Sequence, residues 1–309
     1  MALLYCSGWS DPTPWRAALR RLDPEIDFRV WPESGPVEEI DYALAWHHAP
    51  GSLRAFPRLK AIFSLGAGVE SLLADKELPK SVPILRMVDR ALTAGMTEYV
   101  LLHVLRYHRR VPELEALQRR AEWVELEAPP AWERRVGILG LGVLGSDAAT
   151  KLTGLGFQVA GWSRAPKRIE RVTSFAGEEG LAPLLAHSEI LVCLLPLTNA
   201  TRGILNAKTL AELPRGAALI NAARGGHVVE SDLLAALDSG HIAHATLDVA
   251  AEEPLPAGHP FWRHPRITLT PHVASLTWPP TAAEHIVTNI RRHEAGEPMS
   301  PLVDLRRCY

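Results

Sequence analysis

The sequence predicts an α/β protein with two doubly wound parallel-sheet domains and a cleft between them. Short apolar runs of strand length alternate with amphipathic runs of helix length almost throughout the chain. Parallel βαβ units produce this alternation. It occurs in two series, separated by one long helical stretch, and 309 residues are enough for two domains of ordinary size. In such folds ligands bind at the carboxyl ends of the strands.

The first series fills the N-terminal part of the chain. Its expected strands are 2–7, 27–31, 42–47, 61–66 and 83–88. Its expected helices are 14–22, 51–59 and 69–78. We assign residues 1–100 to a flavodoxin-like substrate domain, completed by residues 276–309.

A long helical stretch follows, from Thr93 to about Glu125, and Pro112 interrupts it. An apolar stripe at helical spacing lies along it, formed by Val100, Leu101, Val104 and Leu105. The domain boundary is expected in this helix, near residue 100. The helix could form a dimer interface, or it could pack within one subunit.

The second series predicts a Rossmann-type dinucleotide-binding domain over residues 101–275. Its expected strands are 136–140, 158–163, 189–196, 217–223, 245–249 and 267–271. Its expected helices are 143–156, 178–188, 206–213 and 229–240. Residues 275–298 form a last helix, opened by a Pro pair, which could return the chain to the first domain.

Composition narrows the class of protein. The 33 basic and 35 acidic residues nearly cancel, so we expect no nucleic acid or membrane partner. The three cysteines, Cys6, Cys193 and Cys308, are few and far apart, which favours free thiols in a reducing cytoplasm, with Cys193 buried. The chain has no apolar run long enough for a membrane span, and its first residues do not resemble a secretion signal.

A glycine-rich turn carries the strongest local signal. Gly140, Gly142 and Gly145 fit G-x-G-x-x-G, directly after an apolar strand and at the start of a helix. The first glycine permits a tight turn, the second allows close approach of a pyrophosphate, and the third allows helix packing. The backbone N–H groups of the helix start, including Val143 and Leu144, then hold the phosphate. The alternative is a glycine-rich turn without a ligand.

The end of the next strand indicates which dinucleotide binds. An NAD site usually has an acidic residue about 20 residues after the glycine turn. Here Trp162 and Ser163 occupy that place, followed by Arg164 and Lys167. Cations and a hydroxyl suit a ribose 2′-phosphate, which a carboxylate would repel. We therefore predict NADPH as cofactor in preference to NADH, although a solvated basic turn is the alternative, as we expect for Arg168.

Three later segments each end a strand and carry polar residues: the first has Arg224, the second has Asp248, Glu252 and Glu253, and the third has His272. Reduction of a 2-keto acid needs a hydride at C2 and a proton at the carbonyl oxygen. A histidine paired with a carboxylate can donate that proton, and an arginine can bind the substrate carboxylate. Each residue alone has a structural alternative, as a turn, loop or strand-end residue.

The remaining histidines do not form a metal-ligand pattern with nearby cysteines or carboxylates, so we expect no metal. His48 follows a predicted strand and could contact substrate.

With these motifs the whole chain resembles the D-isomer-specific 2-hydroxyacid dehydrogenase family. The resemblance is carried by GLGVLG, LPLTNATRGILN, INAARGGHVVESDLLAAL, LDVAAEEPLP and TPHVAS. The segments DYALAWHH, SLGAGVES, GWSR and the terminal VDLRRCY are similar to the bacterial glyoxylate/hydroxypyruvate reductase A type.

The resemblance implies roles for individual residues. Arg224 takes the place of the family's substrate-binding arginine, Glu253 that of the glutamate paired with histidine, and His272 that of the acid/base. Further residues implied at the cofactor are Leu195, Pro196, Ala222, Ala223 and Asp248, the last near the nicotinamide carboxamide. Those implied at the substrate are Trp46, Ala67, Gly68 and Val69. Ala250 stands where many relatives carry an aromatic, which bears on substrate preference.

The resulting hypothesis is an NADPH-dependent reductase of small 2-keto acids, glyoxylate and hydroxypyruvate above all, acting as a cytoplasmic homodimer. Alternatives are a D-2-hydroxyacid dehydrogenase with another keto-acid preference, such as a phosphoglycerate or formate dehydrogenase, and a non-catalytic dinucleotide-sensing protein.

Overall fold

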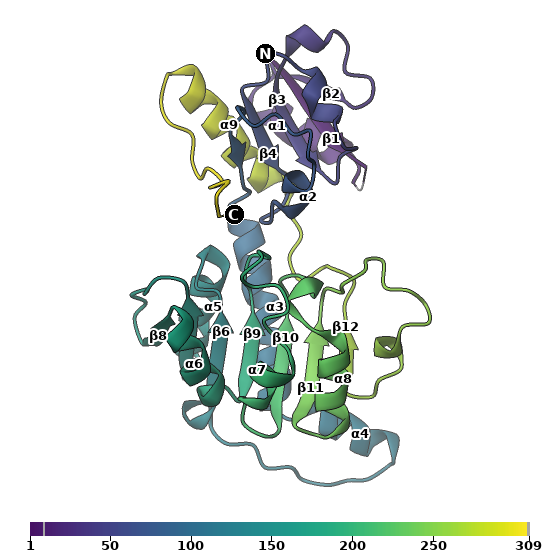
Figure 1. Cartoon of the computed structure of the whole chain (residues 1–309), viewed down its shortest axis with the longest axis vertical. Coiled ribbons are helices and arrows are strands. Elements are labelled where there is room, and N and C mark those ends of the chain that lie inside the picture. Colours follow the sequence, from purple (N-terminus) through teal and green to yellow (C-terminus); the bar gives the residue numbers. More distant parts are fainter. Residues whose placement is uncertain (9, 308–309) are drawn as a thin grey trace. The chain divides into compact units, whose positions relative to one another are not determined.

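The computed structural model describes residues 1–8 and 10–307, which divide into two compact units (Figure 1). The first contains Met1–Leu92 and the segment beginning at Leu276, and the second is Thr93–Ser275. The first boundary falls before the expected position near residue 100. The reason is packing: from Met96 onward, the buried side chains of the long helix belong to the core of the second unit.

The first unit is built on a parallel sheet in the order β2-β1-β3-β4-β5, as far as the chain is described. Its strands are β1 (Ala2–Ser7), β2 (Asp27–Val30), β3 (Ile40–Trp46), β4 (Ala61–Ser64) and β5 (Ile84–Leu85). This is the flavodoxin-like strand order, so the predicted fold class is confirmed for this unit.

Alternating side chains of the central strands fill two cores, one on each face of the sheet. Leu3 and Tyr5 of β1 face one core, while Leu4 and Cys6 face the other. The helices of this unit are α1 (Thr13–Leu22), α2 (Glu70–Leu73) and α9 (Pro279–Glu294). Helices α1 and α9 pack together over the first core, so the C-terminal helix completes this unit (Figure 1).

Two helices predicted for the first unit are shorter than expected. Residues 51–59 form only a 3-10 turn at Ser52–Ala55, because Pro57 prevents continuation of a helix. The expected helix 69–78 is helical only over Glu70–Leu73.

The second unit holds a larger parallel sheet in the order β12-β11-β10-β9-β6-β7-β8 within the described chain (Figure 1). Its strands are β6 (Arg135–Leu139), β7 (Gln158–Ser163), β8 (Val172–Ala176), β9 (Ile190–Cys193), β10 (Ala217–Asn221), β11 (Ile242–Leu247) and β12 (Ile267–Leu269). The order reverses direction beside β6, as in the dinucleotide-binding Rossmann fold. The sequence did not predict edge strand β8, whose residues are only partly buried.

Helices cover both faces of this sheet. They are α3 (Arg90–His108), α4 (Val111–Arg119), α5 (Val143–Gly154), α6 (Leu181–His187), α7 (Ala207–Ala211) and α8 (Glu230–Asp238). One core lies between the sheet and α6, α7 and α8, the other between the sheet and α3 and α5. Cys193 is fully buried in the first of these, as predicted.

The long helical stretch breaks between α3 and α4, with Pro112 in the first turn of α4, as predicted. Val100 and Val104 are buried, but Leu105 of the predicted packing stripe is 39% exposed. The stripe is therefore narrower than expected. Within the described residues, no helix combines the length and hydrophobicity needed to cross a membrane.

Candidate active site

The glycine-rich turn joins β6 to α5, and two of its glycines are required by packing. Gly140 has φ +105°, and a Cβ there would lie 2.7 Å from the carbonyl oxygen of Leu194. A Cβ on Gly145 would lie 1.9 Å from the carbonyl oxygen of Gly140. A Cβ on Gly142, in contrast, would meet no described atom within 4 Å. Gly142 is exposed at the N-cap of α5, where helix N–H groups favour an anion.

Val143 and Leu144 follow in the first turn of α5, with Val143 42% exposed. The turn thus has the expected strand–turn–helix geometry and an accessible helix start.

The basic turn follows β7. Arg164, Lys167 and Arg168 are all exposed. The Ser163 hydroxyl donates to the carbonyl oxygen of Ala165 (2.7 Å) and so stabilises the turn from within. The backbone N–H of Lys167 donates to the Ser174 hydroxyl on β8 (3.1 Å). Strand β8, missed in the sequence, therefore anchors the segment that carries the cations.

Arg224 lies just beyond β10 in a turn whose backbone is held by buried side chains. Asn221 Nδ2 donates to the Arg224 carbonyl oxygen (3.0 Å), and Asn221 Oδ1 accepts from Ala223 N (3.2 Å). The guanidinium Nη1 donates to the Ala223 carbonyl oxygen (2.6 Å). Gly225 follows, and a Cβ there would lie 1.9 Å from the carbonyl carbon of Ala250. The arginine turn is therefore packed directly against the loop that leads to Glu253.

Glu253 and His272 form the hydrogen-bonded pair that the sequence predicts. His272 Nδ1 lies 2.7 Å from Glu253 Oε2, and Glu253 Oε1 accepts from Ala250 N (3.0 Å). Burial favours a raised pKa for Glu253, but the hydrogen bonds from His272 and Ala250 and the charges of His272 and Arg224 outweigh it, and its pKa is lowered. The ionised carboxylate can only accept, so Nδ1 carries a proton and Nε2 is left for other partners.

His272 has a left-handed backbone conformation, with φ 56°. Its backbone N–H donates to the carbonyl oxygen of Asp248 (2.8 Å). The side chain of Asp248 holds the same loop, accepting from Thr270 Oγ1 (2.6 Å), Val273 N (2.9 Å) and Ala274 N (2.9 Å). This nearly buried carboxylate therefore holds the histidine loop, and its expected place near the nicotinamide stays a prediction.

The residues expected beside the cofactor lie after β9 and β10. Leu195, Ala222 and Ala223 are each at most 7% exposed and belong to the cores, while Pro196 is half-buried. Because β6, β9, β10 and β11 are parallel neighbours, the segments that follow them meet at one edge of the sheet (Figure 1).

The residues expected at the substrate lie in the first unit. Trp46 ends β3 and packs on Gly66, where a Cβ would lie 2.9 Å from its ring. Ala67, Gly68 and Val69 follow β4, and the Ser64 hydroxyl donates to the Gly68 carbonyl oxygen (2.8 Å).

The side chain of His48, a possible substrate contact in the sequence, is 1% exposed. His48 Nε2 lies 3.0 Å from Asp75 Oδ2. It is a buried paired residue rather than an exposed one.

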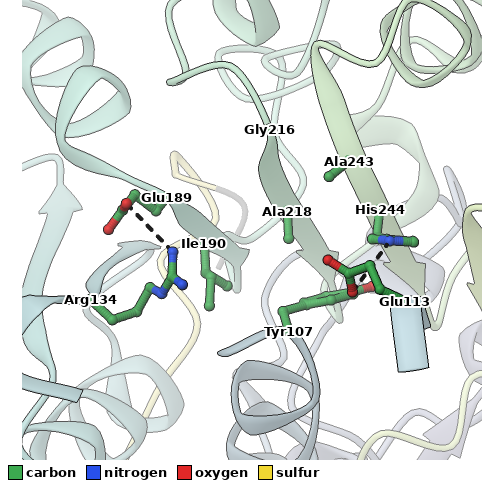
Figure 2. Close-up of a pocket in the computed structure, with 9 residues that line it drawn as sticks. All are labelled: Tyr107, Glu113, Arg134, Glu189, Ile190, Gly216, Ala218, Ala243 and His244. Atoms are coloured by element: carbon green, nitrogen blue, oxygen red, sulfur yellow. Dashed lines mark ion pairs between the residues drawn. The ribbon is translucent and has the colours of Figure 1, made fainter. Parts of the chain in front are cut away.

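A small cavity of about 50 Å³ lies at the opposite, amino edge of the second sheet (Figure 2). Arg134, Glu189 and Gly216, each just before a strand, line it, and Arg134 Nη1 lies 3.4 Å from Glu189 Oε1. His244 Nε2 lies 3.9 Å from Glu113 Oε2. Burial outweighs that carboxylate and lowers the pKa of His244. The lining includes none of the predicted site residues.

No group of three potential metal ligands occurs among the described residues.

Sequence reasoning gave no role to Asn221 and His227, which contact backbone atoms of the arginine turn, or to Gly225, which packs against the backbone of Ala250. An Asn at a strand end before a turn is a recognisable turn signal. No signal in the sequence marks the His227 contacts.

Comparison with known proteins identifies the family. The model for the NAD binding domain of D-isomer specific 2-hydroxyacid dehydrogenases matches residues 101–274. Two relatives named glyoxylate/hydroxypyruvate reductase A, from Serratia proteamaculans and Yersinia enterocolitica, are 45% and 43% identical over the full length of both chains.

Solved structures agree. A D-isomer specific 2-hydroxyacid dehydrogenase from Xanthobacter autotrophicus Py2, in complex with NADPH and MES, has TM-score 0.97 and 48% identity, covering 100% of this chain and 99% of that one. An NADPH-dependent glyoxylate/hydroxypyruvate reductase from Sinorhizobium meliloti, in complex with NADP and sulfate, has TM-score 0.94 and 40% identity at the same coverage. The chain therefore belongs to the D-isomer specific 2-hydroxyacid dehydrogenase family.

Proposed function

We propose that this protein is an NADPH-dependent reductase of small 2-keto acids, which converts glyoxylate to glycolate and hydroxypyruvate to D-glycerate. The observation that carries the proposal is the 2.7 Å contact between His272 Nδ1 and Glu253 Oε2. It provides a positioned proton donor at the sheet edge where Arg224 also lies. The relatives named glyoxylate/hydroxypyruvate reductase A support the choice of substrates.

The proton comes from His272. Glu253 fixes the proton on Nδ1 and orients the ring, so Nε2 holds the proton that passes to the carbonyl oxygen of the keto acid. The lowered pKa of Glu253 keeps its carboxylate ionised through the neutral range, which favours the imidazolium form needed for donation.

Arg224 binds the carboxylate of the substrate and polarises its carbonyl group. Its positive charge contributes to the lowered pKa of Glu253, which is consistent with a guanidinium close to the histidine pair. A planar guanidinium can form two parallel hydrogen bonds with a carboxylate. In the first unit, the backbone N–H groups of Ala67, Gly68 and Val69 and the side chain of Trp46 are proposed to contact the substrate.

The residues at the glycine turn and the basic turn fit NADPH. Packing does not account for a glycine at 142, and the open space beside the start of α5 suits a pyrophosphate. Ser163, Arg164 and Lys167 are proposed to bind the 2′-phosphate, and Asp248, Leu195, Pro196, Ala222 and Ala223 to border the cofactor. When bound, the nicotinamide supplies the hydride to C2.

The test is a panel of 2-keto acids measured at 340 nm with NADPH and NADH side by side. Glyoxylate and hydroxypyruvate with NADPH should give the highest kcat/KM. His272→Ala and Arg224→Ala should lower kcat/KM by about 10² to 10⁴. Near-normal turnover in the folded variants would exclude the proposed roles.

We also propose that the protein is a homodimer. Leu102 and Leu105 on α3 are 60% and 39% exposed, and Leu114 on α4 is 41% exposed. Exposed large apolar side chains on two consecutive helices are candidates for an association surface. Light scattering should give twice the chain mass of 33.9 kDa. Leu102→Asp should yield the monomer, whereas Leu155→Asp, at another exposed leucine, should not.

The reaction is proposed to take place in the cytoplasm. Cys6 and Cys193 are free and buried, and burial raises the pKa of Cys193 to about 12. Buried neutral thiols suit a reducing compartment. Cell fractionation with an antibody against the chain would test the assignment.

A further inference from the structure

The side chain of His227 contacts two segments that the proposed reaction uses. His227 is fully buried in the turn after β10. Its Nδ1 accepts from the backbone N–H of Arg224 (3.3 Å). Its Nε2 lies 3.3 Å from the carbonyl oxygen of Pro196, in the segment expected to border the cofactor. One imidazole ring therefore lies between the catalytic arginine turn and the cofactor wall.

The hydrogen-bond network selects one protonation state for this ring. The Pro196 carbonyl can only accept, so Nε2 must carry the proton. Nδ1 then accepts from Arg224 N, and it also lies 3.0 Å from the Arg224 carbonyl oxygen, which takes a proton from Asn221 Nδ2 (3.0 Å). With the proton on Nδ1 alone, that nitrogen would donate to the Arg224 carbonyl oxygen, but Nε2 would face the Pro196 carbonyl oxygen with a lone pair.

Both contacts act on backbone, and backbone position determines where the functional groups point. Arg224 has an extended backbone conformation (φ −142°, ψ 148°), and its guanidinium is held near the turn by the hydrogen bond from Nη1 to the Ala223 carbonyl oxygen (2.6 Å). The Pro196 carbonyl also accepts from Thr201 Oγ1 (2.7 Å), so two buried side chains hold this wall segment. A shift of about 1 Å in a substrate-positioning group can cost roughly 10²-fold in rate.

We propose that His227 is a positioning residue that links the placement of Arg224 to the placement of the cofactor-binding segment at Pro196. The inference rests on the proposed reductase function, because it assumes that Arg224 binds the keto acid. The two nitrogens of the ring have separate roles: Nδ1 positions Arg224, which binds the substrate, and Nε2 positions the segment at Pro196, which borders the cofactor.

Two conservative variants separate the two contacts. Asparagine places an amide oxygen where Nδ1 lies but ends short of Pro196, and glutamine places an amide nitrogen near Nε2. His227→Asn should therefore keep the KM for glyoxylate and raise that for NADPH about fivefold. His227→Gln should keep the KM for NADPH and lower kcat/KM for glyoxylate about fivefold or more. His227→Leu should lose both hydrogen bonds and therefore show both kinetic changes.

A matched control is His241→Gln. His241 Nε2 also lies 3.0 Å from a main-chain carbonyl, that of Leu210, away from the site residues. This variant should leave both KM values unchanged. If Asn and Gln at position 227 change the kinetic constants for NADPH and glyoxylate equally, in proportion to the loss of thermal stability, the residue is merely structural and the inference fails. Wild-type kinetics in both variants would overturn it as well.

A second variant covers the case in which changes at position 227 prevent folding. Thr201→Val removes the other side-chain donor to Pro196 at nearly constant volume. It should raise the KM for NADPH with the KM for glyoxylate unchanged, and an unchanged KM for NADPH would contradict the role of this carbonyl. Failure of the reductase proposal is distinguishable, since the wild type would then reduce no keto acid. Fluorescence titration with NADPH would still report the cofactor half of the inference.

Discussion

Glu253 Oε2 lies 2.7 Å from His272 Nδ1, and the other oxygen of the same carboxylate is held by the backbone N–H of Ala250. Glu253→Gln keeps an acceptor for the ring but removes the charge that favours the imidazolium. We expect kcat to fall about 10²-fold with the KM for NADPH unchanged. Steady-state assays with glyoxylate measure this, with Glu252→Gln, at the exposed neighbour, as control. A kcat for Glu253→Gln within twofold of wild type would contradict the role.

The basic turn should determine the choice between the two cofactors. Arg164→Ala removes the proposed charge-assisted hydrogen bonds to the 2′-phosphate, so the KM for NADPH should rise about 10-fold or more while that for NADH stays constant. Arg168→Ala, at another exposed cation in the same turn, should change neither value. Equal effects of the two substitutions would mean that only the general charge of the turn matters.

Gly142 and Gly154 lie at opposite ends of α5, and an added Cβ would meet no described atom at either position. Alanine at 142 should leave thermal stability unchanged but weaken NADPH binding about 10-fold, because the methyl group occupies the space expected for the pyrophosphate. Alanine at 154 should leave binding unchanged and stabilise the helix by about 0.5–1 kcal/mol. Fluorescence titration and thermal unfolding measure both. Unchanged NADPH affinity in Gly142→Ala would show that the pyrophosphate does not bind at this turn.

Gly225 is required for a different reason. A methyl group at this position would overlap the backbone of Ala250, whereas the atoms nearest to a Cβ on Gly226 are side-chain atoms of Leu197 and Arg202 at 3.0–3.3 Å. Gly225→Ala should therefore lower the free energy of unfolding by about 2 kcal/mol and displace Arg224, while Gly226→Ala should be milder in both respects. Urea unfolding and kcat/KM test this, and equal stability of the two variants would refute the packing argument.

The buried His103 should make the protein less stable in mild acid. Burial and then the charge of Arg106 lower its pKa to about 4 in the folded state, against an ordinary 6.5. For a histidine with a lowered folded-state pKa, the unfolded chain binds the proton first, so stability is complete above pH 6.5 and falls toward pH 4. The loss from this group between pH 7 and pH 5 should be on the order of 2 kcal/mol.

Urea unfolding of wild type and His103→Gln at both pH values isolates this contribution. The variant should lose less stability on acidification, although it also loses the contact of His103 Nδ1 with Thr246 Oγ1. The same pH dependence in both proteins would show that His103 does not contribute. Carboxylates common to both proteins cancel in the comparison.

The sequence predicted most of the fold because strand and helix periods differ and the central strands of both sheets are largely buried. The glycine turn and the Glu253–His272 pair could be predicted because each occupies a strand end in a parallel sheet. Edge strand β8 was missed, since partly buried residues such as Ser174 give no apolar run. Residues 51–59 do not form the predicted helix because Pro57 interrupts it, although the residues around Pro57 have helix propensity.

The supporting part of the site could not be predicted for a physical reason. Asn221 and His227 were missed, and Asp248 was expected only at the cofactor, because all three form hydrogen bonds to backbone atoms of neighbouring turns. Such bonds depend on the relative placement of loops from different strands, which neither periodicity nor composition specifies. The sequence therefore indicated the reacting groups better than the residues that hold them.

Because the backbone at His272 is left-handed, selection for stability and selection for activity favour different residues at this position. In this conformation a residue with a Cβ is about 1 kcal/mol less stable than glycine, and asparagine tolerates the conformation well. In a library screened only for heat resistance, position 272 should drift toward Asn or Gly. In the same library screened for keto-acid turnover, histidine should persist. Thermostabilisation of this protein therefore needs an activity screen at this position, because sequence optimisation for folding alone favours the loss of the proposed proton donor.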